Sequence, residues 1–216
     1  MPRMAVLEWG ELSWADFVAG LEGYRNNFPR AAQAPDRHPE NAAEIVSILN
    51  SWACRLSSQS APVALAEWLR ENGAALKELE PLTILDPRVR TLADELGGLH
   101  DDLITEMRAN GVNNMADAAA SKALHLLQPR LFVMWDKEIR RSAPEGYGTY
   151  LLQMHDLALR LVEQAPAEDV EAYLQERLGY ETRKTLAKYL DEYNWFEAVG
   201  REQLTARRDR SRAAPG

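Results

Sequence analysis

Hydrophobic residues recur along most of the chain at intervals of three and four positions, the spacing that places them on one face of an α-helix. Strict alternation of apolar and polar residues, which is typical of a half-buried strand, is nearly absent. We therefore expect an all-α protein, built as an orthogonal assembly of many short helices. The pattern predicts helices after Ser13, over 40–56 and 61–77, from Pro87 to beyond Met107, over 115–127, from about Asp136, and over 148–164, 167–177 and 182–195.

Proline and glycine positions indicate where these helices stop and how the chain is divided. The first helix should end before the Asn-Asn-Phe-Pro sequence at 26–29, and the glycine pair at 97–98 should loosen or kink the long helix. We expect one domain over 1–200, followed by a basic, flexible tail over 201–216. Within the domain we expect two lobes, 40–135 and 1–39 together with 136–200, with a cleft between them.

The composition is ordinary for a globular protein, with 46% hydrophobic and 27% charged residues. Cys54 is the only cysteine, which excludes an internal disulfide, a cysteine-only zinc site and a four-cysteine iron–sulfur cluster. No two of the four histidines have the close helical spacing of a metal clamp, so we expect no metal and no cofactor. No signal peptide or apolar run of membrane-spanning length is apparent, so we expect a cytoplasmic monomer that does not contact membranes.

The net charge of −8 argues against a protein that coats nucleic acid through bulk electrostatics. The charge is unevenly distributed, however. Residues 121–143 carry five basic and two acidic side chains, and the tail over 201–216 has the same balance. Two basic regions on an acidic chain are compatible with a local grip on phosphate, although they do not require one.

The most informative segment reads Gly111-Val-Asn-Asn-Met-Ala-Asp-Ala-Ala-Ala-Ser-Lys-Ala-Leu-His-Leu-Leu-Gln-Pro-Arg-Leu-Phe-Val-Met-Trp-Asp136. It contains a glycine turn, a helix of small residues, an apolar connector and an acidic residue that opens the next helix. This order resembles the catalytic core of the helix-hairpin-helix DNA glycosylases. In that family a hairpin precedes an alanine-rich helix, an apolar connector and an aspartate at the start of the following helix.

The resemblance implies a DNA glycosylase in which Asp136 stabilises positive charge on the deoxyribose or activates a water. Such an enzyme hydrolyses the N-glycosidic bond of a damaged or modified base and leaves an abasic site in DNA. A bulky modified pyrimidine of viral DNA, removed in antiviral defence, is one substrate that the breadth of the family allows. The base must leave the stack, so we expect a pocket that receives it. We assign that pocket to Trp135, Asn50, Trp52, Arg55, Tyr147 and Tyr150.

A hairpin followed by a helix N-terminus can present backbone N–H groups to DNA phosphates without needing many lysines. We expect the phosphate contacts to come from this region and from the helix that begins near Asp136. The candidates are Gly111, Asn113, Asn114, Ser121, Lys122, Lys137, Arg140 and Arg141.

The segment departs from the family pattern at two places. The usual hairpin has a second glycine, and here we expect Asn113 or Asn114 to adopt the left-handed backbone in its place. Members that are also lyases carry a lysine just before the alanine-rich helix, where this chain has Ala118, and Lys122 follows one turn later. We therefore expect a monofunctional glycosylase.

Simpler interpretations stand beside the catalytic one. Asp136 can be an ordinary helix cap, Trp52 and Trp135 can be packing residues, and His125 is expected to be a hydrogen-bonded structural histidine. The main alternative function is a non-enzymatic helical module that binds protein or nucleic acid. A further alternative is exchange at the glycosidic bond, with pyrophosphate rather than water as the attacking group.

Overall fold

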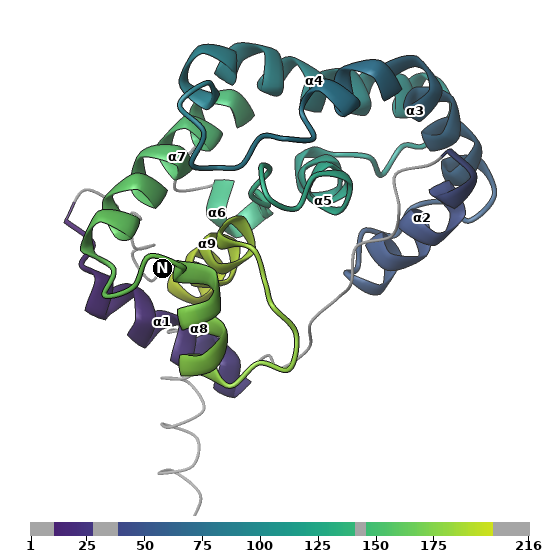
Figure 1. Ribbon diagram of the computed structural model, residues 1–216. Coiled ribbons are helices and arrows are strands. Elements are labelled where there is room, and N and C mark those ends of the chain that lie inside the picture. Colours follow the sequence, from purple (N-terminus) through teal and green to yellow (C-terminus); the bar gives the residue numbers. More distant parts are fainter. Residues whose placement is uncertain (1–10, 28–38, 141–145, 201–216) are drawn as a thin grey trace, which may run out of the picture.

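The computed structural model describes residues 11–27, 39–140 and 146–200, and in these ranges the chain is helical and contains no strand (Figure 1). The predicted all-α class is therefore confirmed. The helices are α1 (Trp14–Asn27), η1 (Pro39–Asn41), α2 (Ala42–Ser51), α3 (Ser60–Glu78), α4 (Val89–Ala109), α5 (Asp117–Leu127), α6 (Lys137–Arg140), α7 (Tyr147–Gln164), α8 (Val170–Leu178), α9 (Leu186–Trp195) and the π-helical turn η2 (Phe196–Gly200). Within these ranges no helix combines the length and the apolar character needed to cross a bilayer.

Two helix boundaries differ from the prediction by four residues or more. The helix expected over 40–56 ends at Ser51, because Ala53 and Arg55 adopt positive φ angles of 63° and 56° that a right-handed helix cannot contain. The helix expected from 182 begins at Leu186. Thr185 caps it, with a side-chain hydroxyl that accepts a hydrogen bond from the Lys188 N–H at 3.2 Å.

The glycine pair at 97–98 lies within α4, and the helix continues through it. Gly97 packs against Gly148 of α7. A Cβ atom added at Gly148 would lie 2.5 Å from the Ala93 carbonyl oxygen, and one added at Gly97 would lie 3.0 Å from the Gly148 nitrogen. The small residues therefore allow α4 and α7 to approach each other closely.

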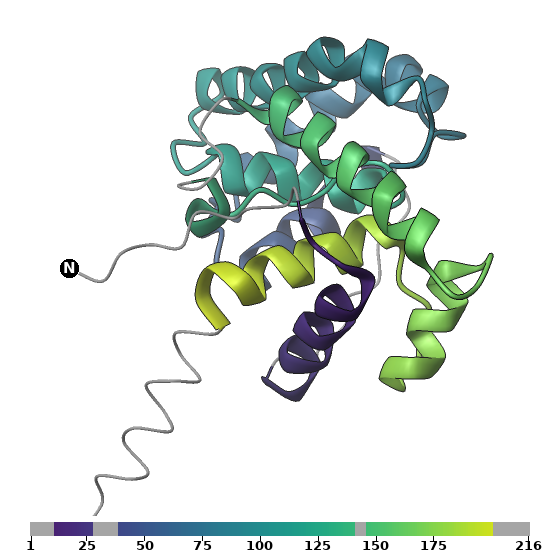
Figure 2. The same ribbon diagram turned by 90° about the vertical axis from the view of Figure 1, so that its left-hand side faces the viewer.

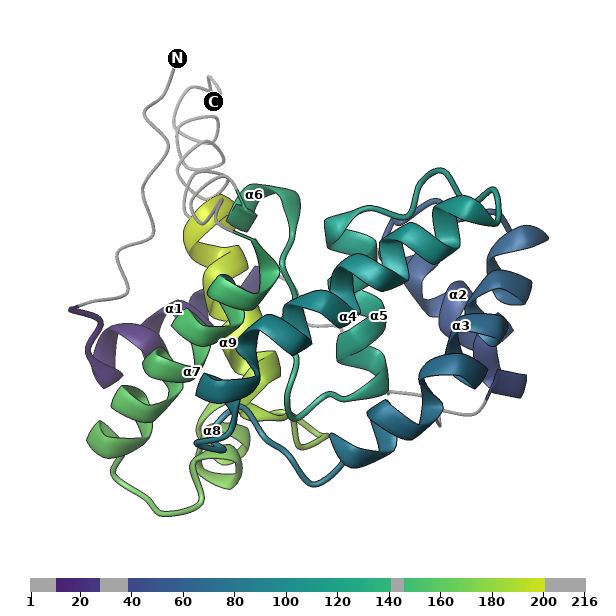
Figure 3. The same ribbon diagram turned by 90° about the horizontal axis from the view of Figure 1, so that it is seen from above.

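The helices pack around a continuous apolar core. Helices α2, α3, α4 and α5 contact one another, as do α1, α8, α9 and η2, while α7 contacts both α4 and α9. Seen from above, α2 and α3 lie at one end of the molecule and α1, α8 and α9 at the other, with α4 and α5 between them (Figure 3). Figure 2 shows α9 running between α1 and the helices around α5. The expected tail over 201–216 lies outside the described residues.

Candidate functional site

A non-helical connector over 131–135 leads from α5 to Asp136, and it is completely buried. Buried backbone groups need hydrogen-bond partners, and here side chains of α5 and α7 provide them. From α5, His125 Nδ1 donates to the Phe132 carbonyl at 2.7 Å, and Ser121 Oγ accepts the Trp135 N–H at 2.9 Å. From α7, the Tyr147 hydroxyl donates to the Val133 carbonyl at 2.9 Å. The Tyr150 hydroxyl donates to the Met134 carbonyl at 3.0 Å. The connector is thus held residue by residue, which determines where Asp136 emerges.

Tyr147, Tyr150 and Trp135, three residues assigned to a base pocket, are all buried. The tyrosine hydroxyls donate to the connector, and burial, aided by the negative charge of Asp191, raises the pKa of each phenol well above 10. Both phenols therefore stay protonated as donors. The indole Nε1 of Trp135 is buried and has no hydrogen-bond partner among the described residues. None of the three rings offers an exposed face on which a base could stack.

Asp136 lies at the end of the connector and forms an ion pair with Lys122 of α5. Lys122 Nζ is 3.0 Å from Asp136 Oδ2, and the side chains are 14% and 26% exposed, respectively. The other carboxylate oxygen of Asp136 accepts the N–H of the adjacent Lys137 at 2.6 Å. A typical helix cap instead bonds to the second or third N–H of the helix, so this contact to the first N–H of α6 differs from the usual capping arrangement.

Cys54 lies within electrostatic range of the Lys122–Asp136 pair. Burial raises the pKa of its thiol, Lys122 lowers that pKa and Asp136 raises it further. No sequence pattern marked this residue. The Lys122–Asp136 ion pair therefore lies beside α5 and close to the turn that carries Cys54.

The turn at 52–55 is fixed by side chains that the sequence placed in a base pocket. Both ends of the Asn50 amide are used by Leu56, whose N–H donates to Oδ1 at 2.6 Å and whose carbonyl accepts from Nδ2 at 3.0 Å. Asn50 is therefore committed to closing the turn rather than to reading a base. Trp52 is half-buried against the core and ends α2, whereas the Arg55 side chain is exposed.

Gly111, with a φ of +79°, provides the left-handed residue of the turn between α4 and α5. Neither Asn113 nor Asn114 has a positive φ, so the prediction that one of them replaces a second glycine was wrong. Asn114 instead donates from Nδ2 to the Arg55 carbonyl at 2.8 Å, which links this turn to the turn at 52–55. The buried Val112 supplies the N–H that bonds to the Met107 carbonyl, so one glycine is enough to reverse the chain.

The remaining phosphate candidates divide into three groups. Ser121 is completely buried and bonded to the connector, so it is not placed to meet a phosphate, contrary to the prediction. Lys137 and Arg140 are exposed, and Arg140 forms an ion pair with Asp117. Arg141 lies outside the described residues.

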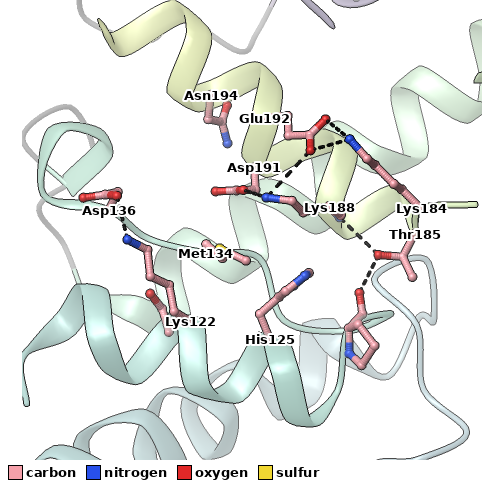
Figure 4. A network of polar contacts seen from close by, with 12 residues as sticks. Lys122, His125, Met134, Asp136, Lys184, Thr185, Lys188, Asp191, Glu192 and Asn194 are labelled. Atoms are coloured by element: carbon pink, nitrogen blue, oxygen red, sulfur yellow. Dashed lines mark hydrogen bonds and ion pairs between the residues drawn. The ribbon is translucent and has the colours of Figure 1, made fainter. Parts of the chain in front are cut away.

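Helix α9, which contacts α6, and Lys184 just before it contribute charged side chains that sequence reasoning missed (Figure 4). Lys188 Nζ is 2.6 Å from Asp191 Oδ2, and Lys184 Nζ is 2.7 Å from Glu192 Oε1 and 3.4 Å from the centre of the Tyr180 ring. Burial raises the pKa of Glu192 and lowers that of Lys184, and each shift is opposed by the partner charge. In the sequence these residues have the spacing of a solvated helix face, so only the packing reveals that they are internal.

His125 lies between the connector and α9 (Figure 4). Burial, with a contribution from the nearby Lys188 ammonium, lowers the pKa of its imidazole to about 4. The ring is therefore neutral near pH 7, and its Nδ1–H donates to the Phe132 carbonyl. The prediction of a hydrogen-bonded structural histidine is confirmed.

The arrangement can place one partly exposed carboxylate, that of Asp136, against a bound group that develops positive charge, with Lys122 as the counter-ion when the site is free. Among the described residues, no three His, Cys, Asp or Glu side chains gather closely enough to hold a metal ion. Comparisons with protein-family models, with curated proteins and with solved structures found no match to this chain.

Proposed function

We propose that the protein is a monofunctional DNA glycosylase of the helix-hairpin-helix type, with Asp136 as the catalytic carboxylate. The observation that carries the proposal is the placement of Asp136, about a quarter exposed at the end of a connector that is hydrogen-bonded to two helices. A catalytic group must be held in position by its surroundings and still be reachable by substrate. Asp136 meets both requirements.

The backbone order around Asp136 supports the same function. A turn with Gly111 in the left-handed conformation precedes α5, and the connector after α5 leads to Asp136 and α6. This is the order expected of the family. We propose that the turn and the first turn of α5 meet the DNA backbone, and that the cleft for the flipped base lies between the two lobes.

Asp136 would act on the sugar. Breaking the N-glycosidic bond leaves positive charge on the deoxyribose, which a carboxylate stabilises strongly where water is excluded. In the free protein the Lys122 ammonium neutralises much of the Asp136 charge at 3.0 Å. Catalysis therefore requires the bound sugar to share or replace this contact. The substrate class that we propose is a damaged or modified base, with a bulky pyrimidine of viral DNA as one member.

The test is base release by purified protein from undamaged, alkylated, deaminated and hypermodified viral DNA, with abasic sites counted. We expect abasic sites from one class of DNA, and loss of at least about a hundredfold in rate for Asp136→Asn. The matched control is Asp169→Asn, because Asp169 is the N-cap of α8 and its carboxylate accepts the Ala172 N–H at 3.0 Å. This variant should retain activity.

Other outcomes identify the alternatives. If no DNA yields abasic sites, and both variants differ from the wild type only in stability, Asp136 is a cap and the binding module is favoured. Base release that depends on added pyrophosphate indicates exchange rather than hydrolysis. A protein–DNA adduct trapped by borohydride, and absent in Lys122→Met, would show a lyase and contradict the monofunctional assignment.

A further inference from the structure

Asp117, in the first turn of α5, forms an ion pair with Arg140 of α6. Arg140 Nη1 contacts Asp117 Oδ2, and the two side chains are 45% and 30% exposed, respectively. The Asp117 carbonyl separately accepts a hydrogen bond from His100 Nε2 at 3.2 Å, so the backbone at this residue is fixed to α4. The ion pair is thus partly open to solvent on a backbone that is held in place.

The position of this carboxylate is unfavourable for binding DNA. Asp117 follows the Gly111 turn and opens α5, the region that is proposed to meet a DNA phosphate. A carboxylate there repels phosphate, and in the free protein it also occupies a guanidinium that could bind phosphate. The same planar fork of N–H donors on arginine suits carboxylates and phosphates alike.

We propose that Asp117 is a built-in competitor of the DNA phosphate. It holds Arg140 in the free protein, and a backbone phosphate takes its place on the guanidinium when DNA binds. This inference rests on the proposed function, because it assigns a role to the same DNA-facing region. This competition weakens the binding of DNA of any sequence. The stability of the complex then depends more on contacts to the flipped base.

Asp117→Asn is the direct test, measured as affinity for an undamaged duplex over a range of salt concentrations. Removal of the competing charge should tighten binding by about fivefold at low salt. In the wild type, the carboxylate released by DNA must recover a cation, which offsets one counterion lost from the DNA. The plot of log affinity against log salt should therefore be steeper in the variant by about one unit.

The chain offers a matched control in Asp156→Asn. Asp156 of α7 pairs with Arg90 of α4 at 2.6 Å, with the arginine 57% and the aspartate 36% exposed. Along the axis of α4, at 1.5 Å per residue, Arg90 lies about 15 Å from His100, which bonds to Asp117, and about 28 Å from the end of the helix at the Gly111 turn. This variant changes the net charge equally and frees an arginine equally, so its DNA affinity should stay close to that of the wild type.

Asp117→Ser is a second variant for the case in which asparagine disturbs the helix, since serine also removes the charge and is a smaller side chain. Tighter binding and a steeper salt dependence in the folded Asp117 variants, but not in Asp156→Asn, would support the inference. Equal effects of the two sites, or weaker binding by folded Asp117 variants, would overturn it even if the wild type releases base. Absence of DNA binding by the wild type and by every variant would overturn the proposed function together with it.

Discussion

At the scale of single residues, burial changes the chemistry of side chains that appear unremarkable in the sequence. His125 stands between two leucines in the chain, and burial of its ring lowers its pKa to about 4. Lys188 illustrates the opposite case, because Asp191 and Glu192 outweigh the effect of burial and raise the pKa of its ammonium. The balance between burial and the nearby charges, rather than the residue type, decides the direction of each shift.

His125 makes the stability of the protein dependent on pH. Below pH 6.5 the histidine of the unfolded chain takes up a proton, whereas the folded one does so only near pH 4. Its contribution to the free energy of unfolding is therefore complete above pH 6.5 and is lost as the pH falls to 4, by up to about 3 kcal/mol. Urea unfolding at several pH values would measure this.

His125→Asn is the control for that prediction, because an amide can still donate to the Phe132 carbonyl but does not titrate in this range. The free energy of unfolding of this variant should change less between pH 6.5 and 4 than that of the wild type. Parallel pH curves for the two proteins would contradict the low pKa of His125.

At the scale of elements, the connector over 131–135 is the segment on which the candidate site depends. Its backbone lies in the core without belonging to a helix, so its polar groups rely on side chains from α5 and α7. Asn194 of α9 extends this support, since its Nδ2 donates to the Tyr150 hydroxyl at 3.1 Å. Three helices thus determine where Asp136 lies.

The two tyrosines of α7 provide a matched pair of variants for testing this support. Tyr147→Phe removes the donor to the Val133 carbonyl and should cost about 1 kcal/mol of unfolding free energy. Tyr150→Phe removes the donor to the Met134 carbonyl and also an acceptor for Asn194, so it should cost about 2 kcal/mol. Equal losses in urea unfolding would show that the link to α9 adds nothing.

At the scale of the whole molecule, α7 connects the helices that precede the connector with those that follow it. It packs closely on α4 and also contacts α9. Gly97 and Gly148 face each other where α4 and α7 approach most closely, and their missing side chains allow this approach. A bulkier residue there would separate α7 from α4 and displace the tyrosines that hold the connector.

Gly148→Ala is the variant that tests this contact. Its Cβ would lie 2.5 Å from the Ala93 carbonyl oxygen, a backbone atom that cannot move aside, so a loss of about 2 kcal/mol in stability is expected. Gly98→Ala is the control, since a Cβ there would have nothing within 4 Å and alanine favours the helix by up to about 1 kcal/mol. A shift of both melting temperatures in the same direction would contradict the proposed role of the close approach.

Most helices could be predicted from the sequence because their apolar faces repeat within one element. The end of α2 could not, since nothing in the residue types of Ala53 and Arg55 favours a left-handed backbone. The turn there depends on Asn50 and on Asn114, which is far away in the chain. Likewise, the sequence indicated that Asp136 precedes a helix but did not indicate that Lys122 would pair with it.

The sequence by itself determined the all-α class, the position of most helices and the order of glycine turn, small-residue helix, connector and Asp136. These features follow from local periodicity and from the conformational preferences of individual residues. Only the tertiary structure decided that Tyr147 and Tyr150 face the connector, that Asp117 holds Arg140, and that α9 buries its charges. Such contacts depend on which helix faces pack together, and pairing across long stretches of chain is not encoded in any short segment.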